Sequence, residues 1–287
     1  MKRITAAIVV VLGLACSSCI FVAPAPAPEG LEDLARFIWD RFDIKADTDV
    51  GVQDHELHEA VINLDKELAD LNVDDDTPFK SVLEDLEEDR VKDLEGMADR
   101  SDRIGLAQGM VAGNIVHCTM KQTENLALSE KSKEIHPDVY SEYEKTFDDD
   151  IESFADGTTD QIFWRLDYAI DEPPVGSPYS AQARAGARRV KAVDDTISPF
   201  GDVFLTRVHL PQPAVFEGEG SQFDLDFQLE TYFQREDGNL IHFYVMWRHM
   251  VLGPVDSSQD IFINASLDGM IDWDKETELA CADGRAD

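Results

Sequence analysis

The sequence is poor in basic residues. It has 25 Lys and Arg against 59 Asp and Glu, so its formal net charge is −34, and its isoelectric point lies near 4.3. A surface this negative repels the phosphate backbone, which excludes nucleic acid as a partner. Apolar residues make up 43% of the chain and are interspersed with the acids, which indicates a folded protein. The acidity is then that of a solvated, self-repelling surface, with a saline habitat or binding of divalent cations as alternatives.

The motifs of the common enzyme classes are also missing. The chain has no Gly-x-Ser-x-Gly elbow, no Walker loop, no dinucleotide-binding fingerprint and no Cys-x-x-Cys outside its N-terminal segment. Carboxylates are too abundant for one acid–base pair to be singled out. The sequence therefore assigns no catalytic residue and no cofactor.

One short run carries the residue types of a metal site. His55, His58 and Glu59 lie in the run HELHE, whereas the zinc-protease motif needs histidines at i and i+4 of a helix. The three side chains share part of a helix face, but the sequence offers no further ligand, so they are weak metal candidates beside an exposed amphipathic helix. The acidic loop before this run is not an EF-hand, because its fifth position, counted from Asp47, is Gly51.

The N-terminus has the layout of an export signal. Lys2 and Arg3 precede an apolar run over residues 4–15, which is too short to span a bilayer comfortably, and Cys16 follows. The last four residues of this segment, Gly13 to Cys16, resemble the lipobox of bacterial lipoproteins. The match departs from that family's pattern at Gly13, where the family prefers Leu.

The resemblance implies a lipid anchor. In bacterial lipoproteins the signal is cleaved before the cysteine and a diacylglycerol is attached to its sulfur, so Cys16 is the expected lipidation site and would be labelled by palmitate. Cys19 is the alternative. Ser17 stands where an Asp would retain a lipoprotein at the inner membrane, which favours export to the outer membrane and its periplasmic side. The resemblance covers residues 1–19, and the Ala/Pro-rich residues 20–30 are expected to form an extended tether.

Two further cysteines, Cys118 and Cys281, lie outside the N-terminal segment. Because disulfides persist in exported proteins, we expect these two residues to be bonded. The bond would fasten the C-terminal tail to the first half of the chain and would contribute up to roughly 4–5 kcal/mol in the chain-entropy model. Two free buried thiols are the alternative.

The strongest structural signal is a β-hairpin over residues 223–251. Apolar and polar residues alternate in its first arm, as in a strand with one buried face. A loop of about three residues that ends at Gly238, in the left-handed conformation, keeps the two apolar faces together. This register sets Asp226 opposite Arg248 as a cross-strand pair of opposite charge.

The periodicity of the whole chain predicts an α+β fold. Residues 31–157 are expected to form a helical region, and residues 158–287 a largely antiparallel β-sheet of about six strands, against which the helices pack. The expected helices cover residues 31–43, 54–71, 79–97, 104–128 and 135–154. The expected strands cover residues 161–170, 179–190, 203–216, the two hairpin arms and 260–267.

The one basic cluster lies in the β region. Arg184, Arg188 and Arg189 follow each other closely on one expected strand. We expect nearby acids to neutralise this strand, with an anion or lipid-headgroup site as the alternative.

Two hypotheses for function follow. The first is a non-enzymatic cell-envelope lipoprotein whose β region binds an unknown protein partner or an apolar ligand. The second is an envelope hydrolase that uses carboxylates or a metal held by His55 and His58. Under the first hypothesis, the second hairpin arm supplies the residues of a ligand pocket. These residues are Phe243, Tyr244, Met246, Trp247 and Met250.

Overall fold

The computed structural model describes residues 24–46, 48–71, 73, 77–136, 139–172, 177–193, 198–256 and 258–286. Cys16, Cys19 and the export signal lie outside the described residues. In chain order the elements are α1 (Leu31–Asp40), α2 (Val50–Asp70), β1 (Phe79–Leu83), η1 (Glu88–Arg90), η2 (Ser101–Leu106), β2 (Gln108–Val116), α3 (Met120–Leu128), α4 (Ser132–Ile135), β3 (Glu142–Phe147), α5 (Ile151–Ala155), β4 (Gln161–Ile170), β5 (Tyr179–Val190), β6 (Val203–His209), β7 (Val215–Phe216), β8 (Ser221–Gln234), β9 (Leu240–Leu252), β10 (Val255–Asp256) and α6 (Asp260–Ala282).

One antiparallel sheet organises the molecule. Within the described residues it has ten strands, eight of them in the order β1-β2-β9-β8-β6-β5-β4-β3, with β10 paired to β9 and β7 paired to β5. Because β2 pairs with β9, strands from both halves of the chain share this sheet. The predicted α+β class is confirmed.

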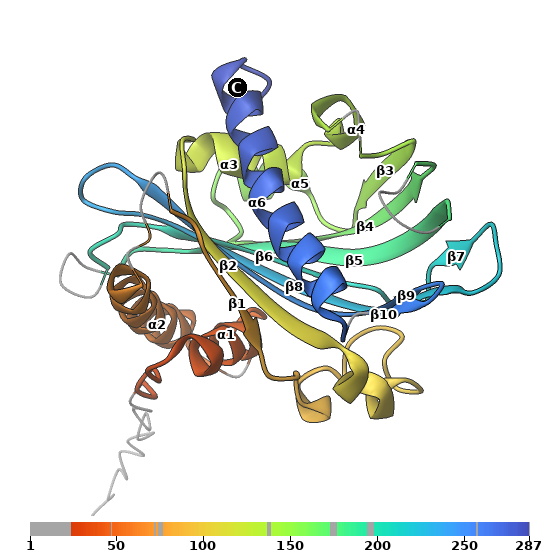
Figure 1. The fold of residues 1–287 in the computed structure, drawn as a ribbon. Coiled ribbons are helices and arrows are strands. Elements are labelled where there is room, and N and C mark those ends of the chain that lie inside the picture. Colours follow the sequence, from red (N-terminus) through yellow and green to blue (C-terminus); the bar gives the residue numbers. More distant parts are fainter. Residues whose placement is uncertain are drawn as a thin grey trace, which may run out of the picture.

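Helices cover both faces of the sheet (Figure 1). On one face α1 and α2 bury Leu34, Trp39 and Leu64 against the apolar side of β8 and β9. On the other face α6 packs Leu267 and Met270 against β2 and β9. Successive side chains of the central strands point to opposite faces of the sheet. These strands therefore supply two separate apolar layers, one under α1 and α2 and one under α6.

The hairpin prediction is confirmed in its register. Leu229 pairs with Val245 and Asp226 with Arg248, and Gly238 has φ 91° in the connecting turn. The ladder shifts between Phe223 and Leu225. This irregularity turns Phe223 away from the face that holds Leu225, so Phe223 packs under α6 instead.

The prediction of a helical N-terminal half is wrong. Residues 79–83, 108–116 and 142–147 are strands β1, β2 and β3, where helices were expected over 79–97, 104–128 and 135–154. A short apolar run does not distinguish a doubly buried strand from a helix. Strand β2 is such a run, and its Gly113 admits α2, because a Cβ there would meet Leu68 Cδ2 at 2.8 Å.

The predicted count of six strands and the last predicted strand are also wrong. Residues 260–267 begin the long helix α6. The eight residues taken alone are compatible with a strand. Over the full length of α6, however, the buried residues recur at helical spacing: Leu267, Met270, Asp274 and Cys281.

Candidate functional site

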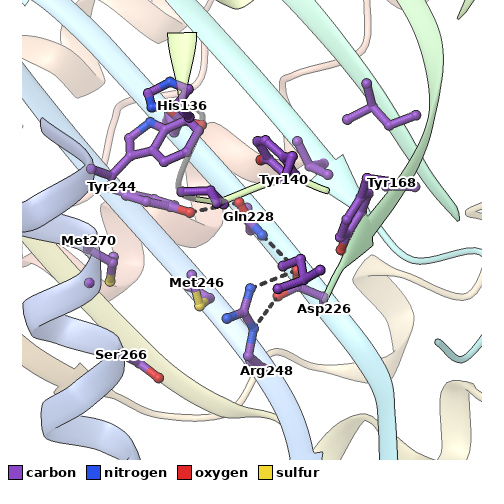
Figure 2. Close-up of a pocket in the computed structure, with 18 of the residues that line it drawn as sticks. His136, Tyr140, Tyr168, Asp226, Gln228, Tyr244, Met246, Arg248, Ser266 and Met270 are labelled. Atoms are coloured by element: carbon purple, nitrogen blue, oxygen red, sulfur yellow. Dashed lines mark hydrogen bonds and ion pairs between the residues drawn. The ribbon is translucent and has the colours of Figure 1, made fainter. Parts of the chain in front are cut away.

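A cavity of about 590 Å³ lies between α6, the curved end of the sheet at β3 and β4, and the α3–α4 segment. Most of its wall is apolar or aromatic, with contributions from five of the central strands and from α6. Figure 2 shows Met270 and Ser266 on α6 facing the cavity from one side and Tyr168 on the other. Protein interiors are normally packed to the density of organic crystals. A space of this size is therefore not a packing defect and has the dimensions of a ligand pocket.

Small side chains keep the cavity open. Ala181, Ala183 and Ala185 alternate along β5 and lie on the face of the sheet that α6 covers. On the opposite wall, Gly269 of α6 lines the cavity, and a Cβ added there would meet no atom within 4 Å. Of the three alanines, Ala183 lines the cavity, where a branched side chain would fill part of the space. The alternating alanines are the sequence signal that could have located it.

Four tyrosines form one wall. The Tyr140 ring lies 5.0 Å from the Tyr143 ring and 5.8 Å from the Tyr168 ring, and Tyr168 lies 6.4 Å from Tyr179. Burial raises the pKa of Tyr143 and of Tyr179 to about 12, so both remain neutral. The wall thus presents aromatic surface with a few hydroxyl groups, which suits a largely apolar ligand.

A chain of polar groups crosses the cavity floor on β8 and β9 (Figure 2). Arg248 donates from Nε and Nη2 to the two carboxylate oxygens of Asp226 at 2.9 and 3.0 Å. Gln228 donates to Asp226 at 2.6 Å, and the Tyr244 hydroxyl donates to Gln228 at 2.7 Å. Burial alone would lower the pKa of Arg248, but the Asp226 carboxylate outweighs it and raises that pKa. This chain is internally paired and carries no net charge.

A second polar group ties α6 to the sheet. His242 Nδ1 lies 2.6 Å from Asp274 of α6, and its Nε2 lies 3.3 Å from Glu230. Asn114 donates to the other Asp274 oxygen at 3.2 Å. Burial opposes the charge on His242, but Asp274 and Glu230 outweigh it and raise the pKa of His242 to about 9. The imidazolium is therefore held between two carboxylates, beside the cavity.

A third polar group, Lys145 on β3, has no such carboxylate partner among the described residues. Its ammonium donates to Ala127 O at the end of α3 at 2.6 Å, and the ring centroids of Trp164, Phe147 and Tyr143 lie 5.0, 5.9 and 6.0 Å from Nζ. Burial lowers the pKa of Lys145 to about 7, and Glu130 opposes this shift only in part. Sequence reasoning missed Lys145, because on the amphipathic helix expected over residues 135–154 this lysine would lie opposite the apolar stripe that holds Tyr143 and Phe147.

The structure brings only part of the predicted pocket together. Tyr244, Met246 and Met250 line the cavity. Phe243 and Trp247 lie on the opposite face of β9, in the core under α1 and α2. The prediction was wrong for these two residues, because successive side chains of a strand point to opposite faces and no single pocket reaches both.

The predicted metal candidates His55, His58 and Glu59 lie on α2 and do not line this cavity. His55 lies 3.3 Å from Glu59, and His58 is buried with its Nε2 2.9 Å from Lys191 O. Across the described ranges, no group of three or more His, Cys, Asp or Glu side chains is arranged to hold a metal ion.

The arginine cluster is neutralised as expected. Arg188 is fully buried and donates to Asp54 at 2.6 Å, while Arg189 contacts Glu124 at 3.0 Å. Arg184 contacts Asp148 at 2.6 Å. Asp54 is an internal residue of α2, and Asp49 caps that helix by accepting from Gly51 N.

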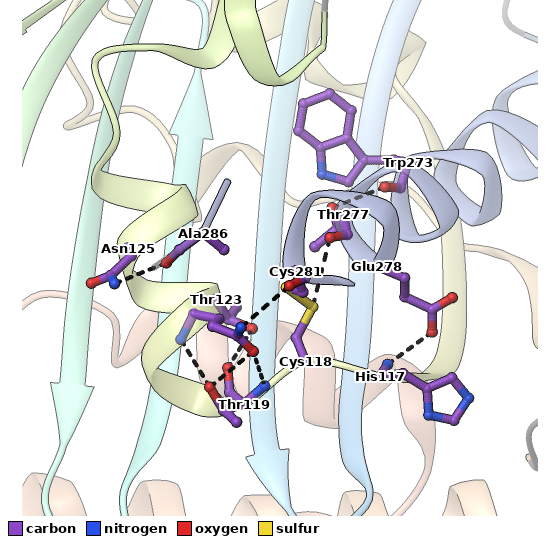
Figure 3. Close-up of a disulfide and its surroundings, with 11 residues drawn as sticks. His117, Cys118, Thr119, Thr123, Asn125, Trp273, Thr277, Glu278, Cys281 and Ala286 are labelled. Carbon is purple, nitrogen blue, oxygen red and sulfur yellow. Dashed lines mark hydrogen bonds between the residues drawn. A yellow bond between two sulfur atoms is a disulfide. The ribbon is translucent and has the colours of Figure 1, made fainter. Parts of the chain in front are cut away.

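The predicted disulfide is present (Figure 3). Cys118, just after β2, is bonded to Cys281 near the end of α6, across a sequence separation of 163 residues. Around it, Asn125 of α3 donates to Ala286 O at 2.9 Å, and His117 N donates to Glu278 at 2.8 Å. The C-terminal half of α6 is thereby fixed at one end of the cavity.

The comparisons with known proteins give structural likenesses only. No family model and no curated protein matches the sequence. Among solved structures, a STAR-related lipid transfer protein from Xanthomonas axonopodis matches at 11% identity and a TM-score of 0.34, covering 63% of this chain and 86% of its own. The human StarD13 lipid transfer and protein localization domain matches at 8% identity and a TM-score of 0.38, covering 72% and 90%. Both likenesses are distant, and what the cavity can bind follows from its own residues.

A search of the described helices for a membrane-spanning segment finds none that is both long enough and apolar enough.

Proposed function

We propose that the protein is a non-enzymatic binding protein that holds one largely apolar ligand in the cavity between α6 and the sheet. The observation that carries this proposal is the cavity itself: about 590 Å³ of space with mainly apolar and aromatic walls. Pockets for small ligands commonly measure about 300–1,000 Å³ and combine such walls with a few polar groups. The paired Asp226 and Arg248 on the floor supply polar contacts without an uncompensated charge.

Binding can be tested with a neutral fluorescent dye, Nile red. We expect saturable binding of one dye per chain. Gly269→Phe should weaken it about tenfold or more, because Gly269 lines the cavity and no neighbouring atom keeps a new side chain out of it. The matched control is Asn264→Phe, which places the same side chain on an exposed position of α6 that does not line the cavity. Absence of saturable binding, or equal affinity of the two variants, would rule out the cavity as the binding site.

We further propose that a lipid on Cys16 anchors this binding domain to the cell envelope, with Cys19 as the alternative site. The support is the lipobox-like run at residues 13–16. The end of the tether docks on α2, where Ala25 N donates to Glu56 at 2.7 Å and Gly30 N to Glu67 at 3.1 Å.

Metabolic labelling with palmitate tests the anchor. We expect the full chain to be labelled, Cys16→Ser to lose the label, and Cys19→Ser to keep it. An unlabelled full chain would contradict lipidation, and loss of label only in Cys19→Ser would move the site to Cys19. Neither result bears on ligand binding, which the dye assay measures separately.

A further inference from the structure

The polar groups that face the cavity differ in how well they are paired. Asp226 and Arg248 neutralise each other through two hydrogen bonds, and Glu230 faces His242. Lys145 is the exception: its side chain is 8% exposed, and among the described residues it makes no ion pair with a carboxylate. In the described part of the chain its one hydrogen bond goes to Ala127 O, which leaves two of the three ammonium hydrogens for another acceptor.

An unpaired ammonium is costly in such surroundings. Three aromatic rings of Tyr143, Phe147 and Trp164 surround Nζ, and the Trp164 indole N–H is itself buried without an acceptor. A buried cation needs an opposite charge or several hydrogen bonds to offset its lost hydration. An anionic oxygen bound beside Nζ would supply both and would bring an acceptor to this wall of the cavity.

We propose that Lys145 forms a subsite for the carboxylate of a single-chain amphiphile whose hydrocarbon part fills the cavity. This inference rests on the proposed function and names the ligand class. The subsite offers one formal positive charge, which matches a singly charged carboxylate better than a phosphate. Among the cations that line or border the cavity, Arg248 contacts Asp226, and His242 contacts Asp274 and Glu230, whereas Lys145 has no carboxylate partner in the described residues and is therefore the cation open to an anionic headgroup.

Two ligands that share a chain test the subsite. Dodecanoate and 1-dodecanol differ only at the head, and their affinities follow from displacement of Nile red. We expect wild type to bind the acid about tenfold tighter than the alcohol, since a charge-assisted hydrogen bond contributes roughly 1.5–3 kcal/mol. In Lys145→Met the ratio should fall to about one while the affinity for dodecanol stays unchanged.

Lys131→Met is the matched control, because Lys131 is an exposed lysine in the neighbouring α3–α4 segment and does not line the cavity. It should keep the preference for the acid. Lys145→Gln replaces Lys145→Met if the latter does not fold. Dodecyl phosphate is the third arm: binding tighter than that of dodecanoate would overturn the assignment to a carboxylate.

Calorimetry supplies a readout that needs no variant. At about pH 8 most Lys145 side chains are neutral, because burial lowers their pKa to about 7. Binding of dodecanoate should therefore take up close to one proton, seen as a dependence of the heat on the buffer, and binding of dodecanol should take up none.

The outcomes separate the two proposals. If dodecanol binds and dodecanoate binds no tighter, or if Lys145→Met keeps the preference, the carboxylate subsite is wrong and the apolar cavity stands. If neither ligand nor Nile red binds saturably to wild type, the proposed function itself is wrong, and the subsite falls with it.

Discussion

At the scale of single residues, the energetics of the site depend on how each buried charge is paired. Arg248, His242 and Lys145 all face or border the same cavity, yet only the first two contact carboxylates within 3.3 Å. Removing one partner of a buried pair leaves an uncompensated charge and destabilises the fold, whereas removing an unpaired buried charge also removes its desolvation cost. The two kinds of group therefore respond in opposite directions to substitution and to pH.

Lys145→Met should stabilise the empty protein. Because burial lowers the pKa of Lys145 from 10.5 to about 7, the ammonium costs stability at pH values below about 7, and this cost shrinks as pH rises towards 10.5. We expect the variant to have a free energy of unfolding higher by on the order of 1–3 kcal/mol near pH 6, with a smaller difference near pH 10. Urea titrations at both pH values measure this. A less stable variant near pH 6 would mean that the bond to Ala127 outweighs the burial of charge.

Asp274→Asn should destabilise the protein in a pH-dependent way. The pKa of His242 is raised from 6.5 to about 9, so its contribution is fully present below pH 6.5 and is lost as pH rises through about 9. We expect a loss of about 2–4 kcal/mol near pH 6 and a smaller loss near pH 10. The control is Asp272→Asn, whose carboxylate is exposed and pairs with Lys275 on the same helix. Equal losses at both pH values would contradict a charged His242.

At the scale of elements, helix α6 sets the depth of the cavity. It is joined to the sheet by Asp274 and to the end of β2 by the disulfide between Cys118 and Cys281 (Figure 3). Both connections involve the C-terminal half of the helix. Its N-terminal half, including Gly269, borders the cavity. Neither the contact of Asp274 nor the disulfide holds this N-terminal half, so it is the part of α6 that can shift most easily when a ligand enters.

Removing the disulfide tests how far α6 depends on this connection. The bond closes a loop with a sequence separation of 163 residues, so its loss should lower the free energy of unfolding by about 2–4 kcal/mol. Urea denaturation of wild type with and without reductant measures the effect. In the Cys281→Ala variant, which cannot form this disulfide, added reductant should leave the free energy of unfolding unchanged. Equal stability of oxidised and reduced wild type would show that packing alone holds the helix.

The elements also show which features of the fold could be predicted from sequence. The register of β8 with β9 was predictable, because strict alternation and a glycine turn leave one pairing that keeps both apolar faces together. Strand β2 was not, since it is buried on both faces and carries no alternation. The start of α6 was misassigned because its helical period emerges only beyond residue 267.

The candidate site was predictable only in part. The aromatic and methionine residues of β9 pointed to a pocket, and three of the five predicted residues line it: Tyr244, Met246 and Met250. Lys145 gave no signal, because what distinguishes it is the absence of a partner, and that depends on which strands and helices surround it. Ala183 of β5 lines the cavity, and its role could not be predicted without knowing which face of the sheet α6 covers.

At the scale of the whole molecule, the acidic surface repels anions, whereas the proposed site binds one. The chain carries a formal net charge of −34, yet Lys145 is proposed to select an anion. Long-range repulsion slows the approach of an anionic ligand and is screened within about 10 Å at 0.1 M salt. Short-range pairing inside the cavity is screened much less, because it is buried. Salt should therefore change the rate at which an anionic ligand associates more than it changes the contribution of Lys145 to the affinity.

Ionic strength should thus act on association of the acid and not of the alcohol. When salt is raised from about 0.01 to 0.15 M, we expect the association rate of dodecanoate to rise several-fold, because the acidic surface is screened, while that of dodecanol changes little. Stopped-flow displacement of Nile red, with both ligands kept below the concentration at which they aggregate, measures these rates. Dodecanol controls for the salting-out of the shared chain. If dodecanoate associates more slowly as salt rises, the entrance attracts anions locally, and the net charge of the chain does not govern how the ligand arrives.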